Sequence, residues 1–294
     1  MAGKKRLDPW YYILNRGAAQ LVPLDLAYRV SEPIADVFHA AWRSKRETAE
    51  RNYARITGQD PDNLAVRRLS RRCFREFGHY VVELLHVQGW GQDTVAERLA
   101  LEGEDHFAEA EAVGKGVIFV SAHMGSAEVA AAIAVRRGYN ITSLAEELRP
   151  RPLWDWVRTC RAKMGVTLLP VNRSGIRLLR ALRRKEMVAF VVDAGVDRGG
   201  GVKVEFFGRQ TSFPDGPARL ARLSGSPVVF ATAVRRRGGR FVASVAAPVH
   251  SDPNLDAEED ARQLTQEIAK SFEGFVRRYP EQWYVFREIW PDSP

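Results

Sequence analysis

The sequence predicts an α/β fold with a largely parallel central sheet flanked by helices and an N-terminal helical lead-in. From Gly116 onward, short apolar runs alternate with helical stretches. Strands that alternate with helices form parallel sheets covered on both faces. Residues 10–112, in contrast, have mostly helical patterns. A chain of 294 residues with 45% hydrophobic content can bury one sizeable core, so a single domain is expected.

The first 112 residues predict two helical segments before the sheet begins. The polar stretch 44–56 suits a solvated helix, which Gly58 and Pro61 end. The next segment carries apolar side chains at helical spacing: Leu64, Leu69, Cys73, Phe74, Phe77, Tyr80, Val81, Leu84 and Leu85. We expect one domain spanning 1–294, in which residues 1–112 form a membrane-associating lead-in and residues 113–294 form the catalytic α/β core.

Seven apolar runs mark the expected strands of the core: 117–120, 141–144, 166–171, 187–192, 202–207, 228–234 and 241–245. The expected helices lie at 127–137, 153–164, 174–184, 217–223 and 255–278. Ligands of such sheets bind at the carboxyl ends of the strands. Five side chains with useful chemistry follow closely on these ends, so a site is expected there: His123, Glu146, Glu147, Arg149 and Asp193.

Residues 116–129 are the most informative segment. An apolar strand runs into His123, and Glu128 follows five positions later at the start of an alanine-rich helix. On one continuous helix these two side chains would point about 140° apart, so we expect His123 on the turn, folded back toward Glu128. The ordinary pKa of an imidazole is about 6.5, which suits it to act as a general base. A neighbouring acid would orient it and stabilise its charged form.

A histidine, four residues and an acid after a buried strand resembles the signature of the glycerolipid acyltransferase superfamily. Three further segments match in the expected order, namely 146–150, 193–208 and 280–283. Over residues 10–291 the chain resembles the bacterial lauroyl/myristoyl lipid A acyltransferases and, more closely, the actinobacterial phosphatidylinositol mannoside acyltransferases. Its C-terminal residues 280–290 look nearer to the mannoside branch, because the lipid A branch typically carries His-Arg-Arg-Phe there.

This resemblance implies a membrane-associated O-acyltransferase that uses acyl-CoA or acyl carrier protein as donor and a glycolipid hydroxyl as acceptor. A phosphatidylinositol mannoside-like acceptor is favoured, and a lipid A-type or lysophospholipid acceptor stays open. No cofactor beyond the acyl donor is implied, and no metal. The sequence does not decide the acyl chain length, the acylated position, the donor or the oligomeric state.

The resemblance also implies roles for five further residues. Glu146 or Glu147 would hydrogen-bond the catalytic histidine, with Glu146 preferred. Arg149 matches an arginine that precedes a proline in the family, and a guanidinium there would hold a phosphate of the lipid headgroup or the acyl carrier. Asp193 follows one expected strand of the core, and Glu205 lies within another. Both are expected to line the substrate pocket.

The charge distribution predicts contact with an anionic membrane surface. The first 80 residues carry 15 Lys and Arg against 9 Asp and Glu, so +6 of the net charge of +8 lies there. Each basic residue near an anionic leaflet contributes about 1 kcal/mol. No apolar run reaches the roughly 18 residues that a spanning helix needs, but residues 10–38 carry amphipathic segments with aromatics. We therefore expect a peripheral or monotopic protein on the cytoplasmic face of the inner membrane.

Three other classes of protein are less well supported. The arginines at positions 67, 68, 71, 72 and 75 share a helical face, which fits a solvated surface or anionic lipid and lacks a nucleic-acid-binding motif. A serine hydrolase would need a G-x-S-x-G turn, which is missing. The glycine-rich residues 193–201 lead into a strand, so the dinucleotide fingerprint fails. A non-catalytic protein that binds anionic lipid stays an alternative.

The chain has two cysteines, and their spacing does not suit metal ligands. This indicates a reducing compartment.

Overall fold

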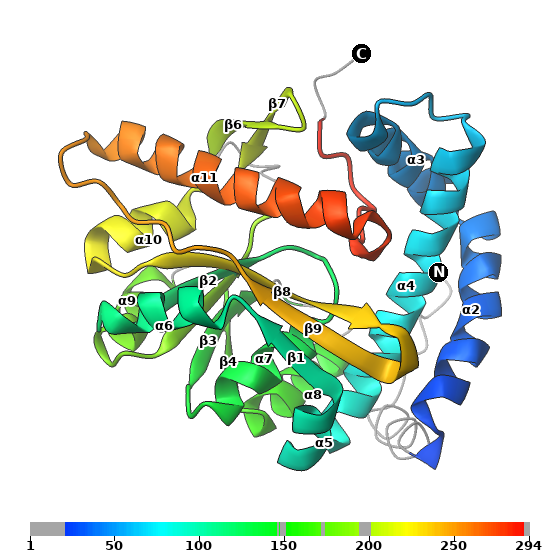
Figure 1. Cartoon of the computed structure of the whole chain (residues 1–294), viewed down its shortest axis with the longest axis horizontal. Helices are drawn as coiled ribbons and strands as arrows, with labels where there is room; N and C mark the ends of the chain where they lie inside the picture. Colours follow the sequence, from blue (N-terminus) through cyan, green and yellow to red (C-terminus); the bar gives the residue numbers. More distant parts are fainter. Residues whose placement is uncertain (1–20, 146, 148–150, 172–173, 194–200, 291–294) are drawn as a thin grey trace, which may run out of the picture.

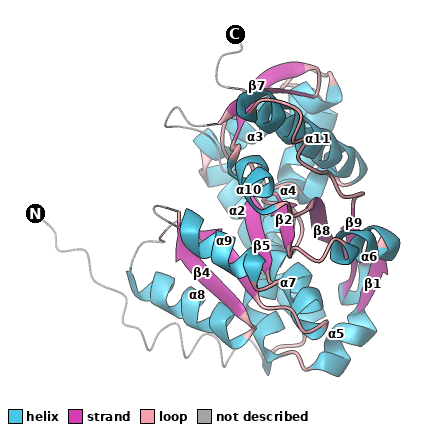
Figure 2. Cartoon of the chain, turned by 90° about the vertical axis from the view of Figure 1, so that its left-hand side faces the viewer, coloured by secondary structure: helices cyan, strands magenta, loops and turns pink. Residues whose placement is uncertain are grey.

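The computed structural model describes residues 21–145, 147, 151–171, 174–193 and 201–290 (Figure 1). Its centre is a seven-stranded sheet with the order β1-β9-β8-β2-β5-β3-β4. Figure 2 shows β4 at one edge of this sheet and β1 at the other. The strands are β1 (Leu99–Glu102), β2 (Val117–Ser121), β3 (Ile141–Ala145), β4 (Val166–Pro170), β5 (Met187–Val191), β8 (Val228–Arg236) and β9 (Arg240–Val245).

Most neighbouring strands run parallel, which confirms the predicted fold class. Strand β2 pairs in parallel with β5 and with β8, and β3 does so with β4 and β5, whereas β8 and β9 are antiparallel. Parallel neighbours need crossover connections, which helices provide. The helices of this part are α7 (Ala127–Arg136), α8 (Arg151–Lys163), α9 (Gly175–Arg183), α10 (Gly216–Ser224) and α11 (Ala257–Arg278).

The two faces of the sheet differ in side-chain size toward the carboxyl ends of the strands. On one face, bulky residues such as Ile118, Val188 and Phe230 are buried in a core that includes residues of α9, α10 and α11. On the other face, alternate positions of the same strands hold Ser121, Ala189 and Ala231, beside residues of α7 and α8. Because neighbouring residues of a strand point to opposite faces, the sequence of each strand sets both surfaces at once.

Two strands were not predicted from the sequence. Strand β1 lies between the short helices α5 (Gln92–Arg98) and α6 (Glu104–Ala112) in the region expected to be helical, and it pairs with β9. Its four residues are too few to show a period of their own. Strand β7 (Arg209–Phe213) forms a hairpin with β6 (Val202–Phe206). Phe207 and Gly208 connect them with positive φ angles of 53° and 69°, as a two-residue hairpin turn with both central φ angles positive requires.

Among the described residues, three long helices that come before the sheet lie together at one side of it in Figure 1: α2 (Leu24–Ala41), α3 (Arg43–Thr57) and α4 (Leu64–His86). Helix α2 packs along α4 through one face, on which Tyr28 and Ala35 are buried. Its other face exposes apolar side chains at positions one helical turn apart, namely Leu26, Val30, Ile34, Val37 and Phe38. Among the helices described, none combines the length and the apolar character needed to cross a bilayer.

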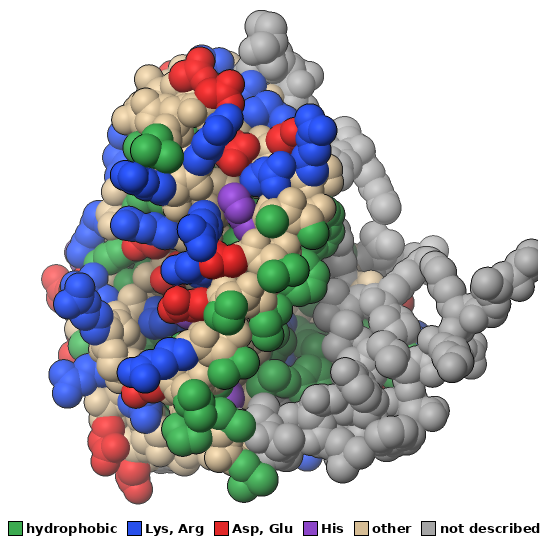
Figure 3. Space-filling view, turned by 90° about the vertical axis from the view of Figure 1, so that its right-hand side faces the viewer, with side chains coloured by type: hydrophobic (Ala, Val, Ile, Leu, Met, Phe, Trp, Pro, Cys, Tyr) green, Lys and Arg blue, Asp and Glu red, His purple; other side chains and the backbone are tan. Residues whose placement is uncertain are grey.

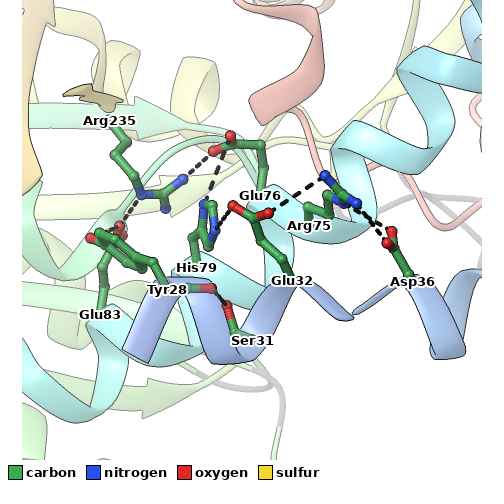
Figure 4. Close-up of polar contacts among 9 residues, drawn as sticks. All are labelled: Tyr28, Ser31, Glu32, Asp36, Arg75, Glu76, His79, Glu83 and Arg235. Carbon is green, nitrogen blue, oxygen red and sulfur yellow. Dashed lines mark hydrogen bonds and ion pairs between the residues drawn. The ribbon is translucent and has the colours of Figure 1, made fainter. Parts of the chain in front are cut away.

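A buried polar network joins α2 and α4 to β8 (Figure 4). Arg235 on β8 pairs with Glu76 and Glu83 of α4. The hydroxyl of Tyr28 on α2 donates to Glu83 at 2.9 Å. Burial opposes the charge of Arg235, but the charge and hydrogen bond of Glu83, together with Tyr284 and the charge of Glu76, raise the guanidinium pKa well above its ordinary value. The network continues at the α2–α4 interface through His79, Glu32, Arg75 and Asp36.

Replacing Arg235 with methionine is expected to destabilise the fold by about 3 to 5 kcal/mol, because Glu83 is fully buried and would keep an unpaired charge. Urea unfolding of the wild type and Arg235→Met measures the difference. The control is Arg219→Met, which removes the more exposed ion pairs of Arg219 with Asp215 and Glu258 and is expected to change the free energy of unfolding by about 1 kcal/mol or less. Equal effects of the two variants would contradict this interpretation of the network.

Candidate active site

His123 lies on the turn between β2 and α7, as predicted. Its neighbours Ala122 and Met124 are buried, whereas 53% of the His123 side chain is exposed. Gly125 makes this turn possible, with a φ of +61°. A Cβ atom at this position would lie 2.1 Å from the carbonyl oxygen of Ala233, which leaves no room for any other residue. The turn is therefore held against β8, and the imidazole projects out of the sheet.

The acid that hydrogen-bonds this imidazole is Asp193, which follows the carboxyl end of β5. Because β5 pairs in parallel with β2, the ends of the two strands bring Asp193 and His123 together. The Oδ1 atom of Asp193 lies 2.9 Å from His123 Nδ1. The backbone N–H of His123 donates to both carboxylate oxygens, at 2.9 and 3.0 Å. Asp193 itself is only 4% exposed.

The charge state of Asp193 fixes the role of each imidazole nitrogen. Burial alone would raise the pKa of this carboxyl group, but the charge and hydrogen bonds of His123, together with the indole N–H of Trp283, hold it below its ordinary value. An ionised carboxylate only accepts hydrogen bonds. The proton of a neutral imidazole is therefore on Nδ1, and Nε2 is the basic nitrogen.

His123 and Asp193 line a cleft of about 950 Å³. One sheet face forms its floor, with the small side chains of Ser121, Ala189 and Ala231 beside larger ones such as Phe119 and Met187. The small side chains leave space beneath α7 and α8. Apolar residues from the helices around it line the rest: Phe77, Tyr80 and Leu84 of α4, Ala130, Ile133 and Ala134 of α7, and Trp154 and Val157 of α8. The cleft is thus largely apolar, and its polar lining includes His123 and Asp193 at the strand ends and Arg161 on α8.

Glu128 does not hold the position that the sequence analysis expected for it. It lies in the first turn of α7, and its Oε1 atom accepts from Arg161 of α8 at 2.6 Å. The Glu128 side chain is 1% exposed, so the guanidinium partner balances a charge that would otherwise be buried alone. The expected orienting contact with the imidazole is made by Asp193 instead, since the first turn of α7 directs Glu128 toward α8.

Glu205 also differs from its expected place. It lies on β6, where Val204 and Phe206 point into the core and Glu205 points outward beside α11, as strand alternation requires. It lines a shallow surface groove with Gln266 and not the cleft of His123. Glu147 is exposed. Glu146 and Arg149 lie outside the described residues, so their roles stay predictions.

Two residues of the site have no role in the sequence analysis. Arg161 reaches the cleft from α8, where it follows the buried Trp154 and Val157 at helical spacing. A cation on an otherwise apolar helical face is a signal that could have found it. Trp283 lies within the matched segment 280–283, and its indole N–H donates to Asp193 Oδ2 at 2.9 Å. No local pattern links positions 193 and 283. Among the described residues, no group of three or more potential metal ligands is placed to hold an ion.

Comparison with known proteins gives a consistent result. The sequence profile of the family described as bacterial lipid A biosynthesis acyltransferase matches residues 4–291. The chain is 26% identical over 258 residues to the phosphatidylinositol mannoside acyltransferase of Mycolicibacterium smegmatis, covering 86% of this chain and 82% of that protein. It is 27% identical over 253 residues to the protein of the same name from Mycobacterium tuberculosis, covering 83% and 77%.

A third relative is the lipid A biosynthesis lauroyltransferase of Escherichia coli, which is 23% identical over 292 residues and is covered over 90% of its length. The alignment with it includes 94% of this chain. Because the family profile extends over nearly all of the 294 residues, the match concerns the helical lead-in and the sheet together. The chain belongs to the bacterial lipid A biosynthesis acyltransferase family and is an acyltransferase that takes an acyl donor and a lipid acceptor.

Proposed function

We propose that the chain catalyses O-acyl transfer from a thioester to a glycolipid hydroxyl, with His123 as the general base and Asp193 as the acid that orients it. The observation that carries this proposal is the 2.9 Å contact between His123 Nδ1 and a buried carboxylate in the wall of an apolar cleft. A base must be partly exposed to reach its substrate, and 53% of the His123 side chain is.

In this mechanism His123 Nε2 takes the proton of the acceptor hydroxyl as its oxygen attacks the thioester carbonyl carbon. A carbon–oxygen bond forms, the carbon–sulfur bond breaks, and the imidazolium gives its proton to the leaving thiolate. Ionised Asp193 stabilises the imidazolium during the transfer. The acyl group passes directly between the substrates, so no acyl-enzyme forms.

The apolar part of the cleft takes the acyl chain in this proposal. Its floor of small side chains and its walls from α4, α7 and α8 supply the apolar surface that a hydrocarbon chain requires. Arg161 supplies a cation in the wall, and Glu128 acts through Arg161 by keeping the guanidinium in place. Glu146, Glu147 and Arg149 are proposed to contact the acceptor or the donor where the chain follows β3.

The favoured acceptor is a phosphatidylinositol mannoside-like glycolipid, and the donor is acyl-CoA or acyl carrier protein. Support for this acceptor comes from the mycobacterial relatives, which are named phosphatidylinositol mannoside acyltransferases and align over more than four fifths of this chain. A lipid A-type or lysophospholipid acceptor is the alternative, because the Escherichia coli relative is named a lipid A lauroyltransferase. Offering the three acceptors with one donor distinguishes them.

The lipid substrates are proposed to reach the cleft from a membrane on which α2 lies. Leu26, Ile34 and Val37 expose between 50% and 67% of their surface on one helical face, and basic side chains gather beside this face on the N-terminal helices (Figure 3). Apolar burial and attraction to anionic lipid together hold such helices in the interface. In this proposal the protein lies peripherally on the cytoplasmic leaflet.

Removing either member of the dyad is expected to lower kcat. His123→Ala removes the base and is expected to lower kcat by about 10² to 10⁴. Asp193→Asn keeps the shape but favours the wrong tautomer, with an expected loss of about 10³ to 10⁴. Thiol release from palmitoyl-CoA in the presence of each acceptor measures kcat. His250→Ala, at an exposed histidine outside the cleft, is the control and should match the wild type. Full activity of His123→Ala would refute the proposal.

The ion pair also predicts a pH dependence of stability. The pKa of Asp193 is lower in the folded protein than its ordinary value, so its stabilising contribution is present above the unfolded pKa of about 3.9 and is lost as the pH falls through the folded value. The difference in free energy of unfolding between the wild type and Asp193→Asn should therefore shrink as the pH falls below about 4. Urea unfolding between about pH 5 and 2 measures it, and a difference that stays constant or grows below about pH 4 would contradict the assignment.

The apolar face of α2 predicts specific membrane binding. The double variant Val30→Glu/Ile34→Glu should weaken binding to vesicles containing anionic phospholipid by about tenfold or more, because each side chain loses about 1.5 kcal/mol or more of burial. Vesicle co-sedimentation measures the binding. The matched control is Ile176→Glu/Leu223→Glu, which places the same charges at apolar side chains exposed by 69% and 73% on α9 and α10. Equal binding of the two double variants would rule out α2 as the docking face.

A further inference from the structure

We infer that Trp283 is a positioning residue that holds the Asp193 carboxylate in the orientation in which Oδ1 faces the imidazole of His123. This inference rests on the proposed function, because it explains how the acid of the dyad is kept in place. The Trp283 side chain does not line the cleft, so it touches neither substrate nor the reacting atoms.

The two oxygens of Asp193 face different side chains. Oδ1 faces both the backbone N–H and the imidazole Nδ1 of His123. Oδ2 faces the same backbone N–H, at 3.0 Å, and the indole N–H of Trp283, at 2.9 Å. The backbone N–H contacts both oxygens, so it alone does not distinguish one edge of the carboxylate from the other. The indole N–H does, since a charge-assisted hydrogen bond at Oδ2 leaves Oδ1 for the imidazole.

Trp283 is held by packing around its ring and by hydrogen bonds to its backbone. Its side chain is fully buried and stands edge-on to Phe206 and Phe272, with ring centroids 5.9 and 5.5 Å apart and interplanar angles of 89°. Its carbonyl oxygen accepts from the hydroxyl of Tyr53 on α3 at 2.8 Å and from Cys73 Sγ on α4 at 3.4 Å. Because these contacts fix Trp283, its indole N–H determines where the Asp193 carboxylate lies.

The residues beside Trp283 hold the other side of the dyad. The backbone N–H of Tyr284 donates to the carbonyl oxygen of His123 at 2.7 Å. The carbonyl of Gln282 accepts from the N–H of Gly125 at 3.0 Å, and the hydroxyl of Tyr284 donates to the carbonyl of Gly125 at 3.0 Å. The segment 282–284 therefore contacts both the histidine turn and the acid, so one short segment sets their relative position.

Trp290 provides a matched comparison within the same region. It is 1% exposed, stacks on Phe206, and its indole N–H donates to the backbone carbonyl of Phe206 at 3.3 Å. Trp283 and Trp290 are thus alike in size, burial and the presence of one indole hydrogen bond. They differ in the acceptor, which is a neutral carbonyl for Trp290 and the catalytic carboxylate for Trp283.

The test compares Trp283→Phe with Trp290→Phe, using two readouts on the full chain. In Trp283→Phe, kcat for acyl transfer should fall by about tenfold with KM changed less than twofold, because the acid no longer holds the base in line. The imidazole ¹⁵N shifts of His123, assigned by their loss in His123→Ala, should show the Nε2–H tautomer, which the wild type lacks. Trp290→Phe should lose comparable stability yet keep the wild-type kcat and tautomer.

A second variant separates the N–H from the ring that carries it. Replacing Trp283 with 3-benzothienylalanine keeps the bicyclic shape and substitutes sulfur for the N–H, so the packing is retained and the same changes in kcat and tautomer are expected. If kcat falls without a tautomer change, or the tautomer changes at full kcat, the positioning role is wrong. If the wild type transfers no acyl group, the proposed function fails, and the tautomer comparison alone decides the role of Trp283.

Discussion

The hydrogen bond between His123 Nδ1 and the buried Asp193 carboxylate is the contact on which the site depends. It exists because β2 and β5 are parallel neighbours, so that residues following the two strands meet at one edge of the sheet. A carboxylate that is only 4% exposed stays ionised only when N–H groups surround it. Here the donors are the backbone and imidazole of His123 and the indole of Trp283. The charge of Asp193 is thus maintained by donors from two distant parts of the chain.

The cleft beside the dyad follows from side-chain size along the strands. Bulky residues on one face, such as Val188 and Phe230, fill the space under α9, α10 and α11. Serine and alanine at the alternate positions, such as Ser121 and Ala189, leave space under α7 and α8. A fully packed protein interior holds few voids larger than a water molecule, so a cleft of about 950 Å³ must be built into the sequence. The same strands therefore contribute to the packed core on one face and to the cleft on the other.

The sequence predicted the elements of this fold well, because strands and helices follow from local periodicity. It predicted the position of His123 on a turn for the same reason, since an expected strand precedes it and an expected helix follows it. The acid that contacts His123 was harder to predict from the sequence, because the strand order β2-β5-β3 is set by packing and leaves no local pattern. Proximity in sequence favoured Glu128, whereas the structure pairs it with Arg161. Glu205 could have been placed correctly from the sequence, since Val204 and Phe206 flank it and a strand alternates.

The N-terminal helices and the C-terminal segment act on the site together, because Tyr53 of α3 holds Trp283 and Trp283 holds Asp193. The central claim is that Nε2 of His123 is the base for the acceptor hydroxyl. A crystal structure with a non-reactive thioether analogue of the acyl donor and the glycolipid acceptor tests it most directly. The account predicts the acceptor hydroxyl within about 3.2 Å of Nε2 and the acyl chain in the cleft beneath α7. An acceptor hydroxyl bound by another group, with His123 facing away from it, would contradict the account.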